Sequence, residues 1–252
     1  MRLVFLCITV VSAIFIFACA GNQNKSVTIE TIELVKNFTV PIVCGAPATD
    51  GSFNITVTMG SSFFINKEGY FLTAGHVLDD WNKIDQSKGA CFPAVYIPKR
   101  GWETLTNVQW IRFDNCVRPN DADIAVCKTM ANPFAIEEVK EKVRIATFEA
   151  LSTVKDGSPV AFTGFPLGSL RPITSIGNIA SYIKTDKLII IDKNAWPGAS
   201  GSPVYLSNGR VIGVLIKRGI NDGSGLAYAV TSDSILEFLA KNKITFQQEK
   251  QP

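Results

Sequence analysis

The sequence predicts an all-β protein, built as a β-sandwich or a β-barrel. Beyond the first twenty residues, short apolar segments rich in Val, Ile, Phe and Tyr alternate with turns containing Gly, Asn, Asp and Pro. Helical patterns are few. The charged segment 136–143 suits a helical turn, and 232–242 places apolar residues on one helix face, with Ser232 or Asp233 as its N-cap. Of the 252 residues, 46% are hydrophobic and 19% charged, which excludes an intrinsically disordered chain.

The charge distribution argues against a nucleic-acid partner. Lys and Arg number 25 against 22 Asp and Glu, a formal net charge of +3 without long blocks of one sign. An electrostatic surface for phosphates needs a concentrated basic patch, and the sequence has none.

The first twenty residues predict export. Arg2 precedes an apolar run from Leu3 to Ala18, which is too short for a membrane span and is followed at once by polar residues. Two processing routes stay open: cleavage before Gly21, or a pattern that resembles a bacterial lipobox, in which lipidated Cys19 attaches the protein to a membrane. An uncleaved anchor is a third. Both cleaved forms predict a periplasmic, lipid-anchored surface or secreted protein.

The expected organisation has four parts. Residues 1–20 form the signal, 21–40 a polar tether that includes a short amphipathic segment, 41–243 one folded domain and 244–252 a tail.

Four cysteines remain after the signal. In an oxidising compartment an even number suggests two disulfides, and the sequence leaves all three pairings open. We favour Cys91–Cys116, because these two share one long loop, and Cys44–Cys127. A zinc site is not expected, because the chain has one His and no C-x-x-C pair. No metal or organic cofactor is predicted.

Three segments carry candidate chemistry, although each alone is more often structural. His76 follows a strand and a small-residue turn, Asp123 begins an alternating strand, and Ser200 lies in a glycine-flanked turn. Together they supply the parts of nucleophilic acyl transfer: a Ser, an imidazole to accept its proton and a carboxylate to orient the imidazole. An α/β-hydrolase is excluded, because no His follows Ser200 and the G-x-S-x-G elbow is absent.

Over roughly residues 52–242 the chain resembles the chymotrypsin-fold serine proteases, most closely the Deg/HtrA-type branch. The matching segments are Gly60–Val77, Lys155–Gly168 followed by Thr174–Ser181, Ser200–Val214, and Gly225–Val230. There are departures. Ala199 and Ser202 replace the usual Asn and Gly, no PDZ domain is expected after the last helix, and the stretch from His76 to Asp123 is longer.

The resemblance implies two antiparallel six-stranded β-barrels, at about 45–135 and 150–230, with a C-terminal helix and an active site between them. It assigns His76 as general base, Asp123 as its orienting carboxylate and Ser200 as nucleophile. The backbone N–H groups of Gly198 and Ser200 would form the oxyanion hole. The expected partner is a polypeptide substrate; the sequence sets no oligomeric state. The alternative is a catalytically silent binding module of the same fold, whose signature would be a lost triad residue.

The resemblance also implies which residues would contact the side chain before the scissile bond: Asn194, Leu215, Ile216 and Leu226. Asn194 offers no carboxylate for a basic side chain, although Asp192 is near in sequence. Lys217 and Arg218 near the rim would favour an acidic residue, but Leu215 replaces the pocket His of the glutamyl endopeptidase branch. We therefore predict cleavage after Val, Ala, Leu or Thr.

Overall fold

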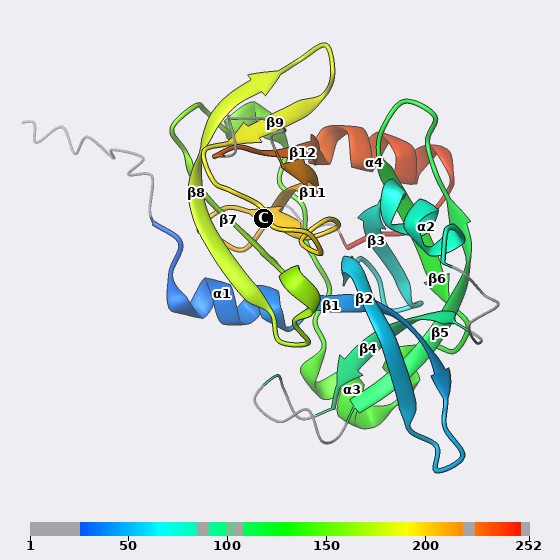
Figure 1. The fold of residues 1–252 in the computed structure, drawn as a ribbon. Coiled ribbons are helices and arrows are strands. Elements are labelled where there is room, and N and C mark those ends of the chain that lie inside the picture. The colour runs from blue at the N-terminus through cyan, green and yellow to red at the C-terminus, as the bar shows by residue number, and fades with distance from the viewer. Residues whose placement is uncertain (1–25, 85–90, 100–101, 103–107, 219–224, 248–252) are drawn as a thin grey trace, which may run out of the picture.

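The computed structural model describes residues 26–84, 91–99, 102, 108–218 and 225–247. Two closed antiparallel barrels, each of six strands in the described part of the chain, confirm the predicted fold class (Figure 1). The first barrel consists of β1 (Thr39–Pro47), β2 (Phe53–Phe64), β3 (Tyr70–Ala74), β4 (Phe92–Pro98), β5 (Val108–Val117) and β6 (Ile124–Thr129). The second consists of β7 (Pro159–Gly164), β8 (Ile173–Ile183), β9 (Leu188–Ile191), β10 (Pro203–Tyr205), β11 (Val211–Arg218) and β12 (Ala227–Thr231).

The two barrels have the same strand order. In the first, the order is β1-β2-β3-β6-β5-β4, and β1 also pairs with β4, which closes the sheet. In the second, β10-β11-β12-β9-β8-β7 closes through pairing of β10 with β7. Closure pairs the two end strands of each sheet with one another, so neither barrel has a free edge strand among the described residues.

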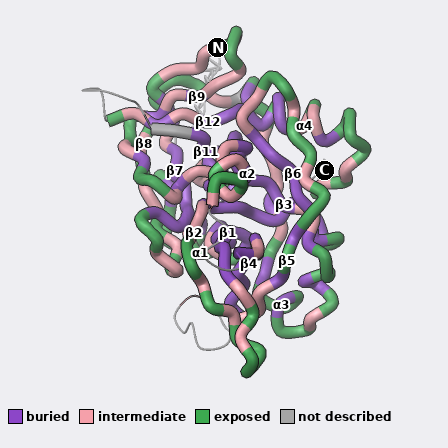
Figure 2. The backbone as a smooth tube through the Cα atoms, turned by 45° about the vertical axis from the view of Figure 1, so that its right-hand side comes forward, coloured by how far each residue is buried: buried purple, intermediate pink, exposed green. Residues whose placement is uncertain are grey.

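Buried apolar side chains fill both barrels and the space between them. Phe63, Phe64 and Phe71 are fully buried in the first barrel, and Phe64 meets Phe71 edge to face at 6.2 Å. The main core cluster also includes Tyr205 and Val214 of the second barrel. Figure 2 shows this burial along the strands, with exposed residues at the periphery. The barrels therefore pack as one unit, which fixes the residues along their junction.

Four helices flank the barrels in the described part: α1 (Ile29–Lys36), α2 (Gly75–Asn82), α3 (Glu137–Lys142) and α4 (Ser232–Lys241). The last two confirm the helical patterns at 136–143 and 232–242. The N-cap of α4 is Thr231 rather than Ser232 or Asp233, and its side chain accepts the N–H of Ser234 at 3.4 Å. No described helix is both long and apolar enough to cross a membrane.

The edges of the folded domain differ from those expected. Residues 29–36, assigned to the tether, form the amphipathic helix α1, whose Val35 is fully buried, and β1 begins at Thr39. At the other end, the Asn66 side chain donates to the Thr245 carbonyl at 2.7 Å. The first part of the expected tail is therefore packed on the first barrel. The signal segment 1–20 lies outside the described residues.

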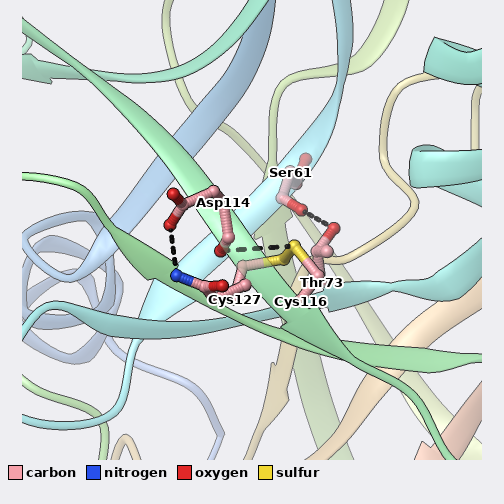
Figure 3. The surroundings of a disulfide bond; sticks show 6 residues. Ser61, Thr73, Asp114, Cys116 and Cys127 are labelled. Carbon is pink, nitrogen blue, oxygen red and sulfur yellow. Dashed lines mark hydrogen bonds between the residues drawn. A yellow bond between two sulfur atoms is a disulfide. The ribbon is translucent and has the colours of Figure 1, made fainter.

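The disulfide pairing favoured from the sequence was wrong. The bonds are Cys44–Cys91 and Cys116–Cys127. The reason is strand adjacency: Cys44 of β1 lies opposite Pro93 of the neighbouring β4. Cys116 lies in a bulge of β5, where the register shifts beside Cys127 on β6. Figure 3 shows this second bond joining the two adjacent strands.

Candidate active site

His76 is positioned by the junction of β3 and α2. The strand ends at Ala74 and the helix begins at Gly75, so His76 lies in the first helical turn. The Gly75 N–H donates to the Asp123 carbonyl at 3.2 Å, which joins this junction to the start of β6. His76 is the only histidine of the chain, and the fold brings it to Asp123 across 47 residues.

Two hydrogen bonds hold His76 and Asp123 together. The backbone N–H of His76 donates to Asp123 Oδ1 at 2.8 Å, and the ring Nδ1 lies 2.7 Å from Asp123 Oδ2. This side-chain hydrogen bond raises the pKa of His76, although partial burial opposes the shift. Burial raises the pKa of Asp123, but the bonds and charge of His76 outweigh it, so the net direction is downward. The pair is therefore set up as a carboxylate that orients an imidazole.

Ser200 reaches the same region from the second barrel. It precedes β10, and its hydroxyl lies 3.4 Å from the carbonyl of Ile216 on β11. Its own carbonyl accepts the N–H of Ser61 on β2 at 2.8 Å. A Cβ atom placed on the adjacent Gly60 would lie 2.8 Å from Val77, the neighbour of His76, and 3.1 Å from the Ser200 carbonyl. The turn that carries Ser200 and the turn that carries His76 thus converge on one glycine of β2.

The turn before Ser200 presents two unused backbone donors. The Pro197 carbonyl accepts the N–H of Leu167 at 2.8 Å, and the Ala199 carbonyl accepts that of Ser202 at 3.0 Å. Because N–H and C=O point in opposite directions across a trans peptide, these bonds turn the N–H groups of Gly198 and Ser200 the other way. Within the described residues neither N–H has an acceptor.

Glycine at position 198 is required by the backbone. Its φ of +90° lies in the left-handed region, where a side chain is strained. A Cβ there would also lie 2.7 Å from the Phe165 carbonyl. The sequence thus supplies the one residue type that lets this turn form against the second barrel.

Sequence reasoning missed Ser61, which joins the two barrels at the turn before Ser200. Its hydroxyl donates to the Gly198 carbonyl at 2.8 Å and accepts the N–H of Phe165 at 2.9 Å. Its carbonyl accepts the Thr73 hydroxyl at 2.8 Å, a bond drawn in Figure 3. Nothing local marks this serine, because its partner Gly198 is 137 residues away. Only the placement of Gly60–Val77 in the resemblance pointed to this strand.

The four residues expected around the substrate side chain lie on the second barrel. Leu215 and Ile216 are buried on β11, Leu226 is half-buried before β12, and the Asn194 Oδ1 atom is buried without a hydrogen-bond partner in the described residues. Asp192 is occupied, because it accepts hydrogen bonds from the backbone and side chain of Asn178. The side chains of Lys217 and Arg218 lie outside the described part of the structure. Within that part, no group of three or more His, Cys, Asp or Glu side chains is placed to hold a metal ion.

Comparison with known proteins agrees with this geometry. Residues 60–214 match the family described as "Trypsin-like peptidase domain". Serine protease HTRA1 of Xenopus tropicalis is 27% identical over 201 residues, which span 75% of this chain but 37% of the frog protein. A probable periplasmic serine endoprotease DegP-like of Chlamydia pneumoniae is 26% identical over 184 residues, spanning 69% of this chain and 32% of that protein.

Solved structures support the fold. The crystal structure of Deg5 aligns with a TM-score of 0.61 over 83% of this chain and 90% of its own, at 18% sequence identity. At that identity the likeness concerns the fold alone. The chain spans about a third of the length of the curated relatives it matches. The family match covers more than half of the chain, and the resemblance expected from the sequence is confirmed: this protein belongs to the trypsin-like peptidase domain family and is similar to its Deg/HtrA-type members.

Proposed function

We propose that the protein is an exported serine endopeptidase that cleaves polypeptides through His76, Asp123 and Ser200. The observation that carries this proposal is the His76–Asp123 pair, joined at 2.7 and 2.8 Å, together with the approach of Val77, the residue after His76, and of the Ser200 carbonyl to the same point beside Gly60. The curated relatives are named as serine proteases, which supports the same reaction class.

The reaction begins with attack of the Ser200 hydroxyl oxygen on the scissile carbonyl carbon, while the neutral His76 ring accepts the hydroxyl proton. Asp123 holds the ring through Nδ1 and stabilises the imidazolium that forms. The N–H groups of Gly198 and Ser200 donate to the tetrahedral oxyanion. His76 then protonates the leaving amine, which leaves an acyl-enzyme. Water, activated by the same imidazole, releases the acid product and restores Ser200.

The substrate is a polypeptide segment bound in extended form. Among the described residues, Asn194 carries no charge and Asp192 is bonded to Asn178, so neither offers a free carboxylate to a basic side chain before the scissile bond. Leu215 and Ile216 add apolar character to the adjoining strand. We therefore keep the preference for Val, Ala, Leu or Thr at that position.

Turnover of an unstructured protein substrate by purified variants tests the proposal. Ser200→Ala or His76→Ala should each lower kcat on the order of 10⁴-fold, because the residues act as one unit. Asp123→Asn should be nearly as damaging, because an Asn cannot hold the required tautomer. All three variants should keep the wild-type fold by circular dichroism.

Asp121→Asn is the matched control, two residues from Asp123 in the same connection. It should keep wild-type turnover. Loss of activity in Asp121→Asn with none in Asp123→Asn would reverse the assignment. A folded wild-type protein without any turnover would favour the silent binding module instead.

A further inference from the structure

Asp79 and Arg118 form an ion pair directly beside the His76–Asp123 hydrogen bonds. Asp79 lies three residues after His76 on α2, and Arg118 lies in the connection from β5 to Asp123. The Arg118 Nη1 and Nη2 atoms donate to the two carboxylate oxygens of Asp79, at 2.5 and 3.1 Å. This two-point contact ties the helix that carries His76 to the connection that carries Asp123.

The contacts around Gly75 show how close the guanidinium comes to Asp123. A Cβ atom on Gly75 would lie 2.8 Å from Arg118 Nη2 and 2.9 Å from Asp123 Oδ1. Both side chains therefore border the same small space, which is free because residue 75 has no side chain. The same Oδ1 atom accepts the backbone N–H of His76. The guanidinium is thus a fixed positive charge next to the carboxylate that orients the imidazole.

We propose that Arg118 is a positioning residue for the reaction: Asp79 holds its guanidinium, and the charge of the guanidinium stabilises the ionised Asp123 that orients His76. Arg118 does not touch the reacting atoms. Its contribution to turnover rests on the proposed function, whereas its electrostatic coupling to His76 can be measured without any turnover.

The charges around His76 predict in which direction each substitution should shift its pKa. Among the described residues, Asp79 and Asp80 of α2 and Asp123 favour the imidazolium, and Asp80 is itself bonded to Lys83 at 3.0 Å. Arg118 lowers the pKa of Asp123 and, as a nearby cation, disfavours protonation of the ring. Removing the charge of Asp79 and removing that of Arg118 should therefore shift the pKa of His76 in opposite directions.

The test is a proton NMR titration of His76 in protein without a histidine tag. Because the chain has one histidine, its ring signals report one pKa without ambiguity. Arg118→Gln should raise that pKa by roughly 0.3 to 1 unit at low ionic strength, and Asp79→Asn should lower it by a similar amount. In the protein that carries both substitutions, the pKa of His76 should lie between the values of the two single variants. Glu137→Gln and Lys140→Gln, which break an exposed ion pair on α3, should leave it unchanged.

The kinetic arm separates positioning from stability. Arg118→Gln should lower kcat on the order of tenfold with little change in KM, and Arg118→Lys should recover part of the loss. Shifts in the same direction for both variants, or an unmoved pKa with a lower melting temperature only, would show that the pair is a structural tie and overturn the proposal. Opposite shifts of the His76 pKa in the two variants, together with a wild-type protein that shows no turnover, would contradict the proposed function and support the coupling.

Discussion

The hydroxyl of Ser202 is buried two positions after Ser200 and, among the described residues, has no hydrogen-bond partner. It fits there because Gly164 of β7 leaves the space empty; a Cβ on Gly164 would collide with the Ser202 hydroxyl. Ser202→Ala should therefore raise the free energy of unfolding by about 1 kcal/mol, since an unpaired buried hydroxyl costs stability. Urea unfolding measures this change.

Ser232→Ala is the control for this prediction. Ser232 is equally buried, but its hydroxyl donates to the Glu149 carbonyl at 2.6 Å. Its removal should lower the free energy of unfolding by about 1 kcal/mol. Equal losses in the two variants would mean that the Ser202 hydroxyl has a partner after all.

The His76–Asp123 pair also sets a pH dependence of stability. The folded-state pKa of His76 is raised, so its contribution is complete below the unfolded-state pKa and disappears as pH rises through the folded value. The pKa of Asp123 is lowered, so its contribution is present at neutral pH and disappears as pH falls through the folded value. Asp123→Asn should abolish the contribution of Asp123 and reduce that of His76, to which Asp79 and Asp80 also contribute.

Urea unfolding across a pH series checks this result. The wild-type free energy of unfolding should decline on the acid side more steeply than that of Asp123→Asn, and activity should fall on the acid side as His76 becomes protonated. Parallel stability curves for the two proteins would show that the pair does not contribute in this way.

At the scale of elements, the two disulfides should have different effects. Cys44–Cys91 joins β1 to the residue before β4 and spans 47 residues, whereas Cys116–Cys127 spans 11 and brackets the connection that carries Asp123. Either double Cys→Ala variant should lose about 2–4 kcal/mol of stability, with the longer loop losing more. Loss of Cys116–Cys127 should lower kcat more, because it frees the Asp123 connection. Thermal unfolding and turnover are measured on both variants. A larger loss of stability without Cys116–Cys127, or a larger loss of kcat without Cys44–Cys91, would contradict this account.

The elements themselves were largely predictable, because strand and helix patterns are local. The wrong disulfides show where local reasoning fails. Cys44 meets Cys91 because the first strand of the barrel pairs with the fourth. The residues near either cysteine in the sequence do not predict this pairing. The helix α1 was placed in a tether because its segment is polar overall, yet docking buries its Val35. Closure and docking are properties of the assembled sheet.

At the scale of the whole molecule, the site depends on how the two barrels are joined. Ser61 of the first barrel bonds both Gly198 and Phe165 of the second. Ser61→Ala would leave a buried carbonyl and N–H unpaired, so it should cost about 1–3 kcal/mol of stability and lower kcat by loosening the turn before Ser200, the proposed oxyanion hole. Its neighbour Ser62 is the control, because its hydroxyl bonds Val40 within the first barrel. Equal kcat values for Ser61→Ala and Ser62→Ala would contradict a role for this joint.

The sequence pointed to the candidate reacting groups of the site but not to the residues that surround them. His76, Asp123 and Ser200 stood out because residue type, order and small-residue turns match the chemistry of acyl transfer. Ser61, Asp79 and Arg118 carry no such signal, since an isolated Ser or an exposed ion pair is common in any sequence. Only the folded structure shows that Ser61 joins the two barrels and that Asp79 and Arg118 link α2 to the β5–β6 connection.

The most direct test of the whole account is active-site labelling with a fluorophosphonate probe, followed by mass spectrometry of the modified peptide. Such a probe bonds covalently to a serine that a nearby base has activated. We predict one adduct, on Ser200, that disappears in Ser200→Ala and is strongly reduced in His76→Ala. Folded wild-type protein without an adduct, or with an adduct on another serine that persists in Ser200→Ala, would contradict the claim that the two barrels assemble a serine protease site.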